Sequence, residues 1–175
     1  LMQNSLRSRF SIKVTSKGEK KLRRDEKPYQ RISEHIGELP VVMVSPDDVS
    51  LVSDSGEDRR RFMNMVLSQM DKEYLSDVQQ YNRLLSQRNT VLKTDRPDIS
   101  LLEILDERMS SFAMHIYERR RRFTEDLFPV VGKYYQSLSG GKESVDIAYK
   151  SDIDKGTLAE ILATARNKDI ALGYT

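Results

Sequence analysis

Two long segments with a helical spacing of apolar residues, separated by a short polar break, constrain the fold of this chain most strongly. In the first, which follows Asp71, apolar side chains recur about every 3.5 residues. The second begins near Ile99 and continues to about Phe128. The break at residues 94–98 contains a proline and two aspartates, which favour the end of one helix and the start of another. Because a short link places long amphipathic helices side by side, the sequence predicts an antiparallel pair over about residues 71–128. The apolar positions are Leu75, Val78, Tyr81 or Asn82, Leu85 and Leu92, then Leu105, Met109, Phe112, Ile116, Phe123 and Leu127.

Strand signals dominate the first 45 residues. Residues 10–14 alternate apolar and polar side chains, residues 16–19 form a turn sequence and residues 20–24 supply a second arm, so a hairpin is predicted. A short helix is predicted from Ile32 to Gly37, ended by its glycine. The apolar run at residues 39–44 is typical of a strand that is covered on both faces.

Helical signals take over after Pro46. Proline fits the first helical turn, and Asp47 and Asp48 complement the positive end of the helix dipole, so capping explains this turn without a metal. A second helix is predicted from Glu57 to about Met70.

The C-terminal third is expected to contain short elements. Pro129 is predicted to end the long helix and to begin a short one that reaches Gln136. The alternation that follows Gly140 and Gly141 predicts a short hairpin with Val145, Ile147 and Tyr149 on one face. A final helix capped by Asp154 is expected over residues 157–167, with a strand beginning at residues 170–172. The predicted fold class is α+β: a mostly α-helical lobe with a long antiparallel helix pair, strands at the N-terminus and a short hairpin near the C-terminus.

Composition excludes several classes of protein. Charged residues make up 32% of the chain and the mean hydropathy is negative, and no apolar run approaches the ~20 residues that cross a bilayer, so no membrane partner is predicted. The absence of cysteine excludes disulfides and thiolate metal sites and agrees with a cytoplasmic location. The net charge is only +2, so attraction to nucleic acid requires local clusters.

No catalytic, cofactor or metal site is predicted. The chain contains no G-x-x-x-x-G-K-[ST] string, which a phosphate-binding loop requires, so it is expected not to hydrolyse ATP by itself. Leu138-Ser139-Gly140-Gly141 spells the start of an ABC signature, but the alternation after it predicts a turn instead of a helix start. His35 and His115 are isolated, which disfavours zinc and nucleophilic catalysis.

Two runs of arginine are candidates for phosphate contact. Arg59, Arg60 and Arg61 either grip DNA phosphates or form a solvated helix face, and three consecutive helical residues fan over ~200°, so all three cannot face one partner. Residues 119–122 circle the long helix and are interpreted mainly as solubilising charge. Tyr81 and Arg88 share a helix face, which suits a buried polar contact as well as a ligand site.

The order and spacing of several motifs resemble the middle of RecF, a family of bacterial recombination mediators with an SMC-like, ABC-type ATPase head. These motifs are the apolar strand at residues 39–44, Pro46-Asp47-Asp48, Arg59-Arg60-Arg61-Phe62, Tyr81-Asn82-Arg83-Leu84-Leu85 and Gln87-Arg88-Asn89. The resemblance implies an internal piece of a larger ATPase. Residues 1–45 would be the β-rich end of the head lobe, and residues 46–175 the helical second lobe.

The resemblance also implies a function for the parent protein. It would bind ATP and Mg²⁺, form an ATP-dependent homodimer, bind DNA at gaps, and help to load recombinase together with RecR and RecO. Arg59, Arg60 and Arg61 become DNA-binding candidates, and Arg59 and Arg60 with Phe62 match the family's RR-x-F pattern. The candidates for structural or lobe-interface roles are Pro46, Asp47, Phe62, Tyr81, Arg88 and Asn89.

A second hypothesis is a free-standing helical interaction module that uses its antiparallel pair as a docking rod. The full reading frame separates the two hypotheses. A GxNGxGKT-like string upstream and an SxGQ-like string downstream would favour the ATPase parent.

Overall fold

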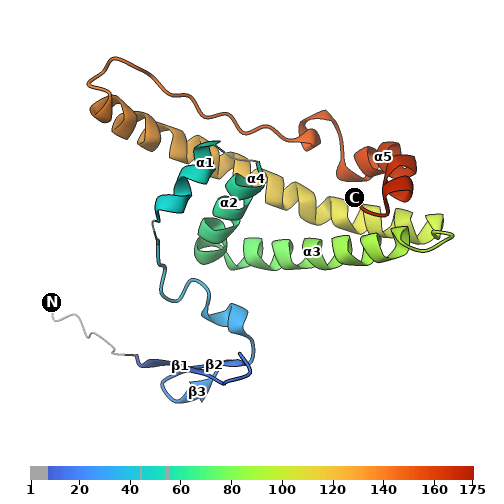
Figure 1. Cartoon of the computed structure of the whole chain (residues 1–175), viewed down its shortest axis with the longest axis horizontal. Helices are drawn as coiled ribbons and strands as arrows, with labels where there is room; N and C mark the ends of the chain where they lie inside the picture. The colour runs from blue at the N-terminus through green and yellow to red at the C-terminus, as the bar shows by residue number, and fades with distance from the viewer. Residues whose placement is uncertain (1–7, 44, 54–55) are drawn as a thin grey trace.

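The structure, a computed structural model, describes residues 8–43, 45–53 and 56–175. Its N-terminal part is a three-stranded antiparallel sheet in the order β1 (Phe10–Val14), β2 (Lys20–Arg24) and β3 (Lys27–Pro28). The predicted hairpin of residues 10–14 and 20–24 is confirmed, with Phe10 opposite Arg24 and Val14 opposite Lys20. Figure 1 shows this sheet to one side of the helices.

The segment after the sheet differs from its prediction. Ile32–His35 forms a short 3-10 helix, η1, but residues 39–43 form no strand, and Val42 and Met43 are 74% and 78% exposed. Residue 44 lies outside the described part of the chain. A strand buried on both faces needs neighbouring strands, and the three-stranded sheet does not extend to this run, so its apolar pattern alone does not form a strand.

Gly37 brings this segment against the helices. Its φ is +86°, and a Cβ built on it would lie 2.5 Å from the backbone oxygen of Gln69, so a larger residue would clash. Glu38 beside it contacts Arg24 Nη1 at 2.6 Å and Lys72 Nζ at 3.3 Å. These contacts connect the sheet to residues 69–72, where two helices of the helical part meet.

The helical part begins with η2 (Pro46–Val49) and α1 (Ser50–Ser53), followed by α2 (Gly56–Met70), α3 (Lys72–Leu92) and α4 (Ile99–Leu138). The predicted antiparallel pair is confirmed: α3 runs beside the first half of α4 in the opposite direction (Figure 1). Both helices are capped as the sequence indicates, because Asp71 accepts from the N–H groups of residues 73 and 74, and Asp98 accepts from that of residue 101. Within the described residues, no helix is long and apolar enough to cross a membrane.

The helices enclose two apolar clusters. One is centred on Leu84, Leu105 and Met109 with Leu162 of α5 (Leu158–Leu172), and the other on Leu67, Tyr74 and Ile116. Tyr81 packs against both clusters. The core therefore unites α2, α3, α4 and α5.

The break predicted at Pro129 is wrong, because α4 continues through it to Leu138. A proline inside a helix removes the hydrogen bond to the carbonyl four residues earlier, here that of Glu125. Glu125 and residues 128–130 are exposed, so water can bond to that carbonyl.

The hairpin predicted near the C-terminus is also wrong in part. The turn is confirmed: Gly140 and Gly141 have positive φ and end α4, with Gly141 N–H donating to the Gln136 carbonyl at 2.9 Å. Residues 142–150 then form no strand. They run back along α4 as an extended segment (Figure 1), and Val145, Ile147 and Tyr149 are half-buried while the residues between them are exposed.

The last elements are η3 (Asp152–Lys155) and α5. Thr157 caps α5 in a capping box with Glu160. The cap predicted at Asp154 is wrong, because Asp154 lies inside η3 and completes the capping box of Ser151. The strand predicted at residues 170–172 is wrong, because these residues continue α5 until Gly173 ends it with φ of +74°. The predicted α+β class is confirmed, with its strands confined to residues 10–28 of the described chain.

Candidate nucleic-acid interface

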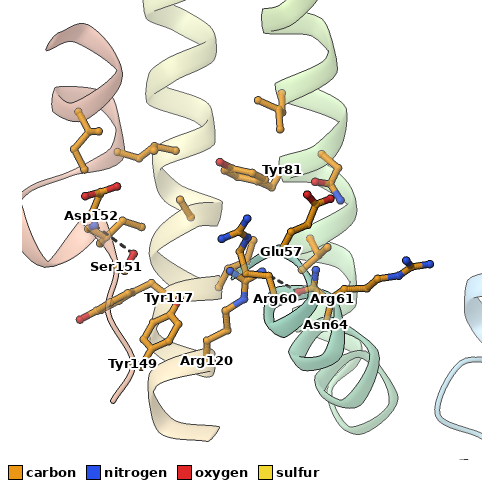
Figure 2. Close-up of a pocket in the computed structure, with 18 residues that line it drawn as sticks. Glu57, Arg60, Arg61, Asn64, Tyr81, Tyr117, Arg120, Tyr149, Ser151 and Asp152 are labelled. Carbon is orange, nitrogen blue, oxygen red and sulfur yellow. Dashed lines mark hydrogen bonds between the residues drawn. The ribbon is translucent and has the colours of Figure 1, made fainter. Parts of the chain in front are cut away.

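A groove of about 700 Å³ lies where α2, α3, α4 and α5 meet residues 149–153. Figure 2 shows Arg60 and Arg120 directed into it from α2 and α4, with Tyr117, Tyr149 and Asp152 on the opposite side. Its lining combines apolar side chains with arginines, tyrosines and two carboxylates. The lining residues are Glu57, Arg60, Arg61, Asn64, Val78, Tyr81, Asn82, Leu85, Ala113, Ile116, Tyr117, Arg120, Tyr149, Ser151, Asp152, Ile153, Leu158 and Ile161.

The three arginines of α2 point in different directions. Arg59 Nη1 donates to the Leu51 carbonyl of α1 at 3.1 Å. Arg60 and Arg61 are exposed and line the groove. Arg59 thus lies outside the groove lining, and Figure 2 shows Arg60 directed into the groove and Arg61 away from it, since each helical residue is rotated by ~100° from the last.

A polar cluster missed by the sequence analysis lies beside these arginines. Arg120 Nε donates to the Tyr74 hydroxyl at 3.0 Å, and its Nη2 donates to Asn64 Oδ1 at 2.9 Å. The same Asn64 oxygen accepts the Tyr74 hydroxyl proton at 2.6 Å. The interpretation of Arg120 as solubilising charge is therefore wrong. The sequence does indicate that Arg120 is half-buried, because residue 120 falls on the apolar stripe between Ile116 and Phe123.

Arg119 and Arg121, on either side of Arg120, lie at the surface of α4. Arg119 contacts Asp71 at 3.2 Å and Glu73 at 3.5 Å, which ties α4 to the start of α3. Arg121 lies 5.8 Å from the centre of the Tyr117 ring and is exposed. Such exposed contacts contribute little to stability.

Burial keeps the phenols of this region neutral. It raises the pKa of Tyr74, and the nearby charge of Arg120 only partly opposes this. Burial likewise raises the pKa of Tyr81, against the opposing charges of Arg120, Arg88 and Arg60. Both hydroxyls therefore act as neutral hydrogen-bonding groups, and the charge at this end of the groove comes from the arginines.

Arg88 lies in a second, buried polar cluster. Its guanidinium is 0% exposed and contacts Asp106 at 2.6 Å and Asp169 at 2.7 Å, so it joins α3 to α4 and α5. It also donates to the Thr175 hydroxyl, and Asn89 Oδ1 accepts from both the N–H and the hydroxyl of Thr175. This placement favours the structural interpretation of Arg88 and Asn89.

Pro46 is exposed at the start of η2, and the neighbouring Asp48 carboxylate accepts from the Ser45 N–H at 2.7 Å. The Asp47 side chain lies outside the described part. Phe62 is half-buried on α2. Within the described residues, no group of three His, Cys, Asp or Glu side chains is placed to hold a metal.

The glycines near residue 140 lie at the wrong end of a helix to bind the phosphates of ATP. Gly140 and Gly141 follow the C-terminal end of α4, where exposed carbonyls make the environment negative. A phosphate requires the opposite, amide-rich end of a helix. The residues of this chain therefore offer no phosphate cradle at the LSGG string.

Comparison with known proteins identifies the relationship, although no family model matches the chain. The chain is 46% identical over 157 residues to the DNA replication and repair protein RecF of Porphyromonas gingivalis, and 43% identical over 156 residues to that of Parabacteroides distasonis. Each match covers 89% of this chain and 43% of the relative, so the chain spans less than half of their length.

A solved structure shows the same fold. It is described as the recombination mediator protein RecF–ATP in the RecFOR pathway, and it superposes with a TM-score of 0.83 at 23% identity, covering 96% of this chain and 48% of the solved one. The similarity of sequence and fold extends over nearly the whole chain. This chain therefore belongs to the RecF family, of whose members it matches a part.

Proposed function

We propose that this chain is the helical-lobe segment, together with the adjoining sheet, of a RecF-type protein of bacterial DNA repair and recombination. The observation that carries the proposal is the 46% identity to a RecF over nine tenths of the chain. The longer protein would act in the cytoplasm, bind ATP and Mg²⁺ through residues outside this segment, dimerise, and engage DNA with RecR and RecO.

The segment's own contribution would be contact with the DNA backbone. Arg60 and Arg61 are exposed at the edge of the groove, and Figure 2 shows Arg60 directed toward Arg120 while Arg61 extends away from both. Basic side chains supply affinity that is independent of sequence, which a protein acting at arbitrary gaps requires. Glu57 and Asp152 in the same groove reduce this positive charge. The arginines of α2 are therefore assigned to the rim of a DNA site and not to its centre.

The test is charge reversal in a RecF-type protein that carries this segment. Arg60→Glu/Arg61→Glu is expected to weaken duplex binding and to reduce the slope of log K against log salt by roughly one per lost contact. The matched control is Arg83→Glu/Arg122→Glu, which reverses two exposed charges on α3 and α4.

Two outcomes contradict this assignment. The first is an affinity and a salt slope that stay unchanged while ATP-dependent dimerisation is lost, because the arginines would then be structural. The second is an equal loss of affinity in the control, because net charge alone would then explain the effect.

A further inference from the structure

The positive charge of the chain is concentrated in its small sheet. Residues 8–31 contain nine lysines and arginines and three acidic residues, a net charge of +6, whereas the whole chain carries +2. The remainder is therefore negatively charged overall. A protein whose excess cations gather on one small element has a preferred side for an anionic partner.

Lysines lie directly opposite each other on this sheet. The register pairs Lys13 of β1 with Lys21 of β2, and the next pair on the same face is Ser11 with Arg23. All four side chains are exposed. Like charges on directly opposed strand residues destabilise a sheet. Within the described residues, no ion pair or hydrogen bond joins Lys13 or Lys21 to a carboxylate, and only Arg23 has one, with Glu26 at 3.9 Å.

A hollow adjoins this face. It measures about 420 Å³ and lies between β2 and residues 28–32, where β3 is only two residues long. Its lining includes Lys21 and Arg23 of this face, Lys20, which the register assigns to the opposite face, and no carboxylate. The larger groove near Arg60, in contrast, includes Glu57 and Asp152. Of these two sites, the one on the sheet therefore has fewer carboxylates to balance its positive charge.

The chemistry of this surface selects its ligand. Adjacent cations without counter-charges suit a ligand with regularly spaced phosphates. Base stacking would require exposed aromatic rings, but Phe10 lies on the opposite face with Arg24 and His35. Tyr29 lines the hollow, but it is half-buried and packs against His35. The ligand is therefore bound by its backbone, which a duplex presents without its bases.

We propose that Lys13, Lys21 and Arg23, with the hollow that adjoins Lys21 and Arg23, form a docking surface for the phosphate backbone of duplex DNA. This inference rests on the proposed function and locates its main backbone contact on the sheet instead of on α2. The like-charge pair is then explained, because an anionic backbone supplies the counter-charge that the fold leaves out.

The experiment measures binding of a short fluorescent duplex by the 175-residue chain, by anisotropy at several salt concentrations. Lys13→Gln/Lys21→Gln is compared with Lys133→Gln/Lys168→Gln, which removes two exposed lysines from α4 and α5. Loss of two phosphate contacts is expected to reduce the log–log salt slope by about 1.8. Wild type should then lose roughly tenfold more affinity than the sheet variant between ~50 and ~200 mM salt. The control variant should follow wild type, and circular dichroism should show both variants folded.

Three results would overturn the inference: no duplex binding by the wild-type chain, equal slopes for the two double variants, or tighter binding of an oligo-dT single strand than of the duplex. A further variant, Lys13→Glu, separates binding from folding. It converts the like-charge pair into an opposite-charge pair, so the sheet gains stability while DNA affinity falls. Each of these failures leaves the proposed function standing, because that function is judged by Arg60 and Arg61 in the longer protein.

Discussion

Arg88 and Arg120 occupy positions where the helical spacing favours apolar side chains. Arg88 lies between Leu85 and Leu92 on the inner stripe of α3, and Arg120 continues the stripe of α4. Each donates hydrogen bonds to partners from other helices: Asp106 and Asp169 for Arg88, and Tyr74 and Asn64 for Arg120. A cation on an inner stripe can thus be recognised from sequence as a buried candidate, but its partners cannot, because they come from distant segments.

The buried Arg88 cluster joins α3 to α4 and α5. Arg88→Ala should lower the free energy of unfolding by about 3–5 kcal/mol, because it leaves the Asp106 and Asp169 carboxylates buried without their cation. The measurement is urea unfolding followed by circular dichroism. Arg83→Ala on the exposed side of the same helix is the control, with an expected change within ~0.5 kcal/mol. Equal stability of the two variants would show that the cluster does not hold the helices together.

Elements made by local interactions were predictable, and elements that need distant partners were not. The α3–α4 pair and its caps at Asp71 and Asp98 follow from spacing and local hydrogen bonds. The runs at residues 39–43 and 145–149 have strand patterns but lack a hydrogen-bonded neighbour, so they stay extended without forming a sheet. The arginines of α2 were found through their motif, whereas the basic face of the sheet emerged only with its register, which sequence spacing does not give.

Helix α4 passes through Pro129 and therefore lacks one backbone hydrogen bond. Pro129→Ala should restore the missing hydrogen bond, so the second half of α4 should open less readily. The expected gain in helix stability is up to ~3 kcal/mol. The ~0.4–1 kcal/mol by which proline stabilises the fold, through the lower entropy of the unfolded chain, is subtracted from it. Amide hydrogen exchange over residues 130–138 measures it, with Ser137→Ala as the control for helix propensity alone. Unchanged protection in Pro129→Ala would mean that the helix already frays beyond this point.

At the scale of the molecule, positive charge and core lie in different places. The sheet carries the excess cations, while the helices carry the two apolar clusters and the buried Arg88 cluster. Contacts of Gly37 and Glu38 with the junction of α2 and α3 join them. This separation suits a segment in which the helices give a rigid body and the sheet and the adjoining α2 rim meet an anionic partner. The division at residue 45 between two lobes stays a prediction.

The whole chain should not bind Mg-ATP in a saturable manner, although a relative of the same fold is described as RecF–ATP. No phosphate-loop string occurs in the sequence, and the glycine pair at residues 140–141 follows the carbonyl end of α4, which repels phosphate. Isothermal titration calorimetry measures this, with salt near ~200 mM to suppress weak attraction to the basic sheet. The control is a full-length RecF titrated identically, which should give a saturable isotherm. A low-micromolar dissociation constant for the 175-residue chain would contradict the prediction and would locate a nucleotide site within these helices or the sheet.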